Sequence, residues 1–387
     1  MGSSGTETRI VGAAEAAYER HPAAGRLTET FIAEAVVAAL ANAGIDHREV
    51  DGFGVASFLL GPDHAVDLAW KLGFTVSWLM EDTNGGASGI NLLQHAVRAI
   101  EAGDAETIVI AAGDRMESRE FERMVSEYNQ VTRDYLSPLP LTGPNALFAF
   151  ITERYGSAHG LEREDFGCVP IAQRAWAAQN PGAVYRSPMT LAEYLEAPPV
   201  APPLTRYDCV PIVSGGNALV LTSAERAERL GGPSVGVRAI RALWNHDQQD
   251  GDGIDTGFAR FRDDLWTAAG VRPEDVGAAF VYDDYPVMVL AQLADLGLIG
   301  DGDLKRFLHT CLVEEHWPLN TSGGQLSAGQ AGAAGGMHGL VEAVGQLRGE
   351  AGERQVEGLE LALATGYGMV LYSHGASHNA AVLERHG

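Results

Sequence analysis

The sequence predicts a layered α/β sandwich in which two related halves each contribute a central sheet. Three observations predict it: an internal duplication, strands that are apolar without interruption, and amphipathic helices between them. The first repeated pair consists of "AGIDHREVDGFGVASF", which begins at Ala43, and "AGVRPEDVGAAFVYDD", which begins at Ala269. Both segments end a helix, turn through an acidic step and enter an apolar strand.

A second repeated pair carries the same pattern further along each half. "GGASGINLLQHAVRAIEAGDAETIVIAAGD" starts at Gly85, and "GGMHGLVEAVGQLRGEAGERQVEGLELALATG" starts at Gly335. Each predicts a Gly-rich turn, an amphipathic helix, a short loop and a strand, and the strands 107–113 and 359–366 are apolar enough to be covered on both faces. The helices repeat apolar residues at helical spacing: Ile90, Leu93, Ala96, Val97 and Ile100 in one, and Leu340, Val341, Val344 and Leu347 in the other.

The region from 115 to 205 interrupts the first half. It is richer in aromatic residues, Arg, Glu and Pro, as in "SPLPLTGP" and "EAPPVAPPLTRYD". An insertion of this size often covers a substrate site, and a surface elaboration is the alternative. The predicted organisation is therefore a first half (1–114 plus about 206–230), an inserted cap or loop region (115–205) and a second half (231–387).

Composition limits the classes of function. The chain has 387 residues, 46% of them hydrophobic and 20% charged, which is typical of a globular protein, and no apolar run reaches the roughly 18 residues of a membrane span. Its net charge of −24 argues against nucleic-acid binding and fits a solvated acidic surface or a more basic partner. Three cysteines without a CxxC pair favour the cytoplasm, and the scattered histidines predict no metal site.

The stretch "DTNGGASGI", residues 82–90, looks like an active-site turn that leads into a helix. Small residues permit the tight backbone approach of such a turn. The turn nevertheless has no cysteine or histidine, and the serine it does have, Ser88, together with Asn84, reads as a cap or turn residue. The sequence therefore predicts the architecture of a nucleophile turn without a nucleophile.

Several stretches in order resemble the thiolase superfamily. They are "NGGASG", "RYDCVPIVSGGNALVLTSAERA", "VYDDYPV", "HWPLNTSGGQLSAGQAGAAGG" and "ATGYG", and they span nearly the whole chain. The pattern is most similar to the branch related to sterol carrier protein X and to its steroid side-chain aldolases. The resemblance implies a thiolase-like, duplicated αβαβα five-layer sandwich with an inserted cap, usually dimeric through the sheet edge of the first half. In that pattern "SGGNALVLTSAERA" forms a Gly-rich turn, a strand and a helix.

The thiolase motifs can be placed on this sequence residue by residue. The Cys-x-Ser-Gly motif falls on 86–89, so the nucleophile position is Gly86. The Gly-His-Pro motif falls on 329–331, which puts Gln330 in place of the histidine, and the final Cys-x-Gly motif falls on 364–366, which puts Ala364 in place of the cysteine. In thiolases the helix N-terminus activates the thiol of the nucleophilic cysteine. Because position 86 carries no thiol, classical Claisen condensation is not expected.

The resemblance places Tyr282, which opens "YDDY", where an oxyanion donor lies in thiolases. A retro-aldol cleavage needs a base for the β-hydroxyl proton and a donor for the thioester enolate, without a covalent intermediate. Tyr282, Gln330 and Asp283 are the catalytic candidates, and Tyr285, Tyr367 and His338 are local candidates for proton delivery. Ordinary alternatives stay open: a strand-end tyrosine at 282, and turn chemistry at Gln330 and Asn320.

Residues beside these candidates are expected to bind substrate: Gly86, Ser88, Asn320, Gly323, Gly324 and Gly366. The Gly-rich loop 323–336 would let a pantetheine arm approach the backbone closely. Arg119, Arg123 and Arg133 of the insertion are candidates for the diphosphate of coenzyme A. Cys209, Cys168 and Cys311 are interpreted as small buried hydrophobes.

The leading hypothesis is a lyase that cleaves a β-hydroxyacyl-CoA by a retro-aldol route, with a steroid or other bulky side chain as substrate. Coenzyme A would be part of that substrate, and no covalently bound cofactor is expected. The alternatives are a non-covalent acyltransferase and a catalytically inactive acyl-CoA-binding or scaffold subunit. The resemblance also implies a homodimer that works with a small zinc-ribbon/OB-fold protein in a heterotetramer.

Overall fold

The computed structural model describes residues 7–136, 138–139, 143–247, 251, 254–300, 302–371 and 374–387. Within these residues, the main strands form a nine-stranded sheet in the order β3-β2-β4-β7-β1-β8-β11-β10-β9. The first five belong to the first half of the chain: β1 (Thr8–Glu19), β2 (Gly52–Ala56), β3 (Trp78–Asp82), β4 (Thr107–Asp114) and β7 (Ser214–Ser223). The last four belong to the second half: β8 (Ser234–Trp244), β9 (Ala278–Phe280), β10 (Leu361–Leu371) and β11 (His374–His386).

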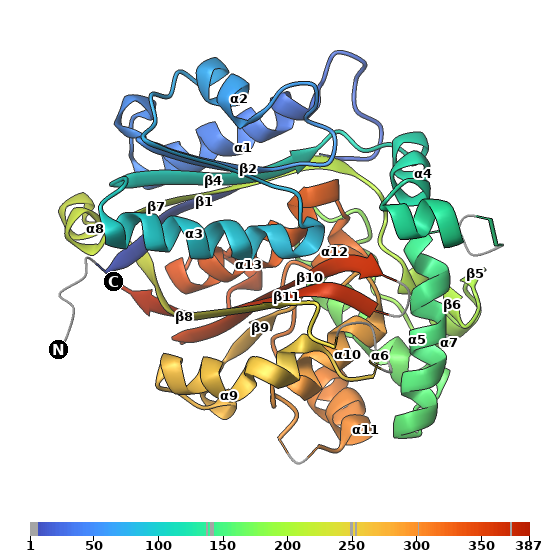
Figure 1. Ribbon diagram of the computed structural model, residues 1–387. Coiled ribbons are helices and arrows are strands. Elements are labelled where there is room, and N and C mark those ends of the chain that lie inside the picture. Colours follow the sequence, from blue (N-terminus) through green and yellow to red (C-terminus); the bar gives the residue numbers. More distant parts are fainter. Residues whose placement is uncertain are drawn as a thin grey trace.

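The two half-sheets are separate layers joined at one point. Strands β1 and β8 pair only through Arg9 with Gly236 and Ile10 with Val235, and beyond that point the half-sheets diverge around two central helices (Figure 1). The central layer is α3 (Ser88–Ala102) with α13 (Gly335–Arg348), and the outer layers are α1 (Thr28–Ala43) with α2 (Ala65–Lys71), and α9 (Gly257–Ala269) with α10 (Pro286–Asp295). The predicted five-layer α/β sandwich is confirmed.

Glycines allow the two central helices to start against each other. A Cβ atom on Gly89 would lie 2.1 Å from the carbonyl oxygen of Gly336, and a Cβ on Gly336 would lie 2.9 Å from that of Gly86. Because real Cβ atoms do not approach other heavy atoms this closely, the first turns of α3 and α13 pack backbone against backbone. The repeated Gly-rich turns of the sequence are therefore a packing requirement at the centre of the molecule.

Two details of the predicted strands need correction. The strand expected at 359–366 begins at Leu361 and continues to Leu371. The glycine pair of "SGGNALVLTSAERA", expected as a turn, lies inside β7. A Cβ on Gly216 would lie 2.6 Å from the carbonyl oxygen of Phe31 in α1, and a Cβ on Gly215 would lie 2.3 Å from the ring of Tyr18. These glycines therefore let α1 and the Tyr18 ring approach the strand closely, and they do not turn the chain.

The inserted region is mainly helical and lies along one side of the sandwich, at the ends of the half-sheets (Figure 1). It contains α4 (Ser118–Ser126), a π-helix (Thr132–Leu136), α5 (Gly143–His159), α6 (Arg163–Ala177) and α7 (Leu191–Leu195), followed by β5 (Pro199–Ala201) and β6 (Leu204–Thr205). Outside the inserted region, the structure also has the α-helices α8 (Ala224–Leu230), α11 (Leu304–Arg306) and α12 (Gly324–Ala328), a π-helix (Phe307–Glu314) and several short 3-10 helices. Among the helices described here, none is long and apolar enough to cross a membrane.

Candidate active site

A largely apolar cavity lies between the inserted region and the central layers. Its volume is about 170 Å³. Apolar and aromatic side chains of the insertion line one side, among them Phe121, Met124, Val125, Tyr128, Leu136 and Leu147. The sandwich closes the other side with Gly86, Tyr282, Asp284 and Gln330. The cavity thus has an apolar wall from the insertion and a polar end from the core, the usual composition of a small-molecule site.

Tyr282, Asp284 and Gln330 form a hydrogen-bonded group at this polar end, here called the polar triad. The Tyr282 hydroxyl donates to Oδ2 of Asp284 at 3.1 Å and accepts from Nε2 of Gln330 at 3.0 Å. The same Gln330 nitrogen also donates to Oδ1 of Asp284. Tyr282 and Asp284 follow β9, whereas Gln330 follows α12, so the fold brings together residues far apart in the sequence.

The ring of Tyr282 fills the space in which a nucleophile would stand. A Cβ atom on Gly86 would lie 2.3 Å from Cζ of Tyr282 and 2.3 Å from the carbonyl oxygen of Tyr367. A side chain at position 86 and a tyrosine at 282 in this position therefore exclude each other. The turn has no nucleophile, and the side chain of Tyr282 occupies that place.

Burial governs the ionisation of the polar triad. Burial, with the charge of Asp284 as a second cause, raises the pKa of the Tyr282 hydroxyl well above its usual value. Burial and then the charge of Asp283 raise the pKa of Asp284 to about 7, although the hydrogen bonds from Tyr282 and Gln330 oppose the shift. The phenol therefore stays protonated near neutrality, and the carboxyl group of Asp284 changes its charge there.

Asp283, a predicted catalytic residue, is held by a different set of groups. Its carboxylate accepts from the backbone amides of Gln325 and Leu326 in α12, at 3.0 and 3.2 Å, and from Nε2 of Gln173 in α6 at 2.9 Å. Burial raises the pKa of Asp283 to about 6. These contacts anchor α12, and through it the segment that carries Gln330.

Of the six predicted substrate-binding residues, Gly86 lines the cavity, whereas the other five are not among its lining residues. Ser88 donates to Asp82, and Nδ2 of Asn320 donates to the carbonyl oxygen of Val281 at 3.0 Å. Gly323 and Gly324 have φ of 96° and 60°, in the left-handed region. A Cβ on Gly366 would lie 2.4 Å from Oδ1 of Asn379.

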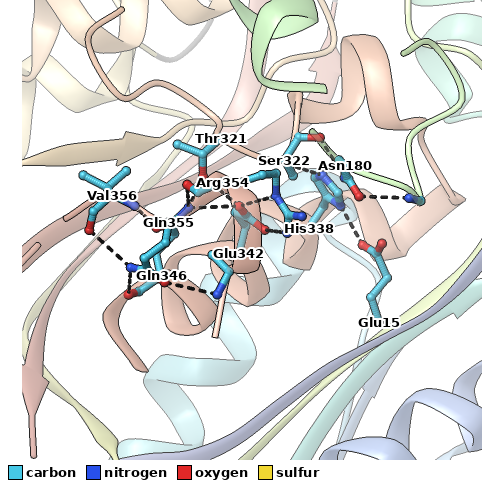
Figure 2. A network of polar contacts seen from close by, with 12 residues as sticks. Glu15, Asn180, Thr321, Ser322, His338, Glu342, Gln346, Arg354, Gln355 and Val356 are labelled. Carbon is cyan, nitrogen blue, oxygen red and sulfur yellow. Dashed lines mark hydrogen bonds and ion pairs between the residues drawn. The ribbon is translucent and has the colours of Figure 1, made fainter. Parts of the chain in front are cut away.

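The three candidates for proton delivery separate in the structure. Tyr285 lines the cavity and its hydroxyl donates to Oδ1 of Asn145 at 2.6 Å. The Tyr367 hydroxyl accepts from the backbone amide of Gly375 at 3.0 Å. His338 lies in another polar network, where it contacts Ser322 and Glu15, each at 2.8 Å (Figure 2). Tyr285 alone of the three is placed beside the polar triad.

Two features of the insertion also bear on ligand binding. Arg119 and Arg123 are exposed on α4, the helix that gives Phe121 and Met124 to the cavity, and the exposed Arg133 is paired with Asp134. Cys209 lies in the cavity wall, where burial raises its thiol pKa to about 12, whereas Cys168 is buried beside His309. Within the described residues, no cluster of three or more His, Cys, Asp or Glu side chains is arranged to hold a metal ion.

The fold and site define a thiolase-fold protein without the cysteine nucleophile. A family model described as thiolase C-terminal domain-like matches residues 248–385. The chain is 32% identical to the 17-hydroxy-3-oxo-4-pregnene-20-carboxyl-CoA lyase of Mycobacterium tuberculosis, over 93% of this chain and 96% of the relative. It is 31% identical to a steroid side-chain-cleaving aldolase of Thermomonospora curvata, over 84% and 86%.

The chain therefore belongs to the thiolase superfamily, in the branch of the steroid side-chain-cleaving aldolases. A solved structure described as the Ltp2-ChsH2(DUF35) aldolase superimposes with a TM-score of 0.83 and 26% identity, over 98% of each chain. The resemblance seen in the sequence is confirmed.

The sequence missed Asp284, which completes the polar triad. A signal was present, because alternate residues of an extended segment point to the same side. Tyr282 and Asp284 therefore face the cavity together, while Asp283 between them faces α12.

Proposed function

We propose that this protein is a carbon–carbon lyase that cleaves a β-hydroxyacyl-CoA thioester by a retro-aldol reaction. One observation carries the proposal: the Tyr282 ring takes the space of a side chain at position 86 and brings a neutral donor to the polar end of an apolar cavity. Acyl transfer through a covalent intermediate needs a nucleophile at that place. Cleavage of an aldol needs only a base and donors for the enolate oxygen, which the polar triad provides.

In this reaction the Tyr282 hydroxyl and the Gln330 amide stabilise the negative charge that develops on the thioester oxygen. Donors placed in advance are worth most where water is excluded, as at the end of this cavity. Asp283 acts indirectly, by anchoring the start of α12. Gly86 gives the thioester close access to the backbone, and Ser88, Asn320, Gly323, Gly324 and Gly366 act indirectly, through their contacts with other protein groups. Arg119 and Arg123 on α4 offer positive charge for the coenzyme A diphosphate.

The apolar wall favours a hydrocarbon acyl group, and the names of the relatives suggest a steroid. The first substrate to test is therefore 17-hydroxy-3-oxo-4-pregnene-20-carboxyl-CoA. A retro-aldol cleavage of this thioester breaks the bond between C17 and C20. It yields a 17-keto steroid and propanoyl-CoA, and both products can be separated by chromatography and identified by mass spectrometry.

Tyr282→Phe tests the site. We expect kcat to fall about 100- to 1,000-fold, the usual loss on removal of one oxyanion donor. Tyr135→Phe is the matched control, because Tyr135 is 63% exposed and should keep wild-type turnover. Full turnover by Tyr282→Phe contradicts the site. Acyl transfer to an added nucleophile, or thioester binding without any product, would favour the acyltransferase or the scaffold subunit over the lyase.

We also propose that the active assembly is a homodimer joined to a small zinc-ribbon/OB-fold partner. Strand β3 is the outermost strand of the first half-sheet, and Leu79 on it is 42% exposed, which favours pairing with a second copy. The related aldolase structure carries the name of a second protein, ChsH2(DUF35). Light scattering of the chain with and without a zinc-ribbon/OB-fold protein should distinguish a dimer from a heterotetramer, and a monomer under both conditions would contradict the proposal.

A further inference from the structure

The base for the β-hydroxyl proton has to be a group that is unprotonated near neutrality and reaches the cavity. Tyr282 does not meet the first condition, because burial raises the pKa of its hydroxyl well above the usual value. Its proton is also engaged, since the hydroxyl donates to Oδ2 of Asp284 at 3.1 Å. The Gln330 amide donates hydrogen bonds but does not ionise, so it cannot take up a proton as a base. The polar triad therefore contains one group that can serve, and it is the carboxylate.

Asp284 is placed and polarised for this task. Its side chain lines the cavity beside Gly86, and its contacts in the triad are with Tyr282 and Gln330, which are neutral donors. A carboxylate in a guanidinium pair is a poor base, because the charged form is stabilised. With neutral donors only, burial raises the pKa of Asp284 to about 7, which suits a group that must take up and release a proton.

The neighbouring ionisable groups do not compete for the role. Tyr128, Tyr285 and Cys209 line the same cavity as Asp284, and burial raises the pKa of all three, so they stay neutral near pH 7. Asp283 titrates in the same range but is bound to the backbone amides of α12. Asp284 is the carboxylate that both reaches the cavity and can give up its contacts.

We propose that Asp284 is the general base of the lyase, an inference that rests on the proposed retro-aldol function. The carboxylate takes the proton of the β-hydroxyl, the oxygen becomes a carbonyl, and the electrons of the broken carbon–carbon bond pass to the thioester as an enolate. Protonated Asp284 can then donate to the Tyr282 oxygen, which frees the phenol hydrogen for the enolate oxygen. Asp284 finally returns the same proton to the α-carbon, so no net proton is consumed.

The test compares Asp284→Asn with the wild type, each in complex with the zinc-ribbon/OB-fold partner, on 17-hydroxy-3-oxo-4-pregnene-20-carboxyl-CoA. The wild-type kcat/KM should fall as the pH drops through about 7, because protonation removes the base. Asp284→Asn should lose about 100- to 10,000-fold in kcat, the range of general base catalysis. It should also lose the acid limb of the pH profile, that is, the fall in kcat/KM at low pH. Asp284→Glu should recover part of the rate and the limb, and Tyr282→Phe should keep the limb at a lower rate.

The control is Asp295→Asn. Asp295 is another carboxyl whose pKa burial raises to about 6, and it accepts from Thr256, away from the cavity. This variant should keep both the rate and the acid limb. If Asp284→Asn keeps its kcat within about threefold and keeps the limb, the base is another group and the inference is overturned, while the lyase itself stands.

A second measurement covers the case in which the steroid thioester is not cleaved, which would count against the proposed function. Propanoyl-CoA in deuterium oxide exchanges its α-hydrogens if a base can reach the α-carbon beside an oxyanion donor. Exchange by the wild type and at least about 100-fold slower exchange by Asp284→Asn would support Asp284 as the base. No exchange by the wild type, or equal exchange by both, would overturn the inference.

Discussion

Two polar clusters in this protein, one of which includes Glu15 of the first half, treat their carboxylates differently. In the network of Figure 2, Glu342 pairs with Arg354 at 2.9 Å and Glu15 with His338 at 2.8 Å. In the polar triad, Asp284 meets Tyr282 and Gln330, which carry no charge. A cation fixes the charge of a carboxylate, whereas neutral donors leave it free to titrate. Pairing with a cation therefore suits a carboxylate that stabilises the fold, and neutral donors suit a carboxylate that takes up and releases a proton.

The network also holds His338, which is not among the residues that line the cavity. Although burial opposes the charged imidazole, Glu15 raises the pKa of His338 above its usual value. Ser322 and Tyr18 complete its contacts, at 2.8 and 3.1 Å. The histidine thus connects α13 to β1, through Glu15 and Tyr18, and to the loop before α12, through Ser322.

The largest expected effect comes from removing a cation of the network. Arg354→Met leaves Glu342, which is 9% exposed, with hydrogen bonds from Thr321 and Gln346 but without a counter-charge. Breaking such a buried pair usually costs about 3–5 kcal/mol of the free energy of unfolding. Urea denaturation measures this loss. The double variant Glu342→Gln with Arg354→Met should regain most of the stability, and an equal loss in both would show that the charge is not the cause.

The next effect concerns the geometry of the polar triad. Gly86→Ala places a methyl group 2.3 Å from the Tyr282 ring and from the Tyr367 carbonyl oxygen. A displacement of the ring by about 1 Å should reduce kcat about 100-fold, equivalent to about 2.7 kcal/mol. Steady-state kinetics measure it. Gly345→Ala is the control, since a Cβ there meets nothing within 4 Å. Normal turnover by Gly86→Ala would contradict the mutual exclusion of residue 86 and Tyr282.

Sequence patterns were sufficient for the layers but not for the contacts at the site. The repeated turns, helices and apolar strands predicted the sandwich because each has a local period. The meeting of Tyr282 and Gln330 depends on how two loops pack, and the family resemblance, not the spacing, brought them together in the prediction. Adjacent aspartates 283 and 284 look alike in sequence. Their roles differ because one faces the amides of α12 and the other faces the cavity.

The glycines show the same limit from another direction. The pair in β7 reads as a turn, because glycine is common in turns. In the structure the strand continues through it, and the glycines admit Tyr18 and the backbone of α1. Close approach of distant segments leaves the same mark on a sequence as a turn does. Only the packing distinguishes them.

The pH dependence of stability sharpens the comparison further. Burial raises the pKa of Asp295 to about 6, so the folded state binds its proton more tightly than the unfolded state. The stability that this provides is complete below the unfolded pKa and is lost as the pH rises through about 6. Because the Asp295 side chain is only partly buried, we expect the free energy of unfolding to fall by about 1–2 kcal/mol over this pH range. Melting curves at pH 5 and 8 should show a smaller difference for Asp295→Asn than for the wild type, and an unchanged difference would contradict this assignment.

The smallest expected effect is that of Cys209→Ala. Cys209 lies in the cavity wall, and covalent thioester chemistry in this protein would have to use such a thiol. Burial and then the charge of Asp208 raise its pKa to about 12, so almost no thiolate exists at neutral pH. Removing the sulfur, which leaves the methyl group of alanine, should therefore change kcat by less than about threefold, or under 1 kcal/mol, through packing alone. Rates of cleavage and trapping by iodoacetamide measure this. Loss of turnover in the alanine variant, together with rapid alkylation of the wild type, would show that a thiolate takes part and would make the neutral donors of the polar triad secondary.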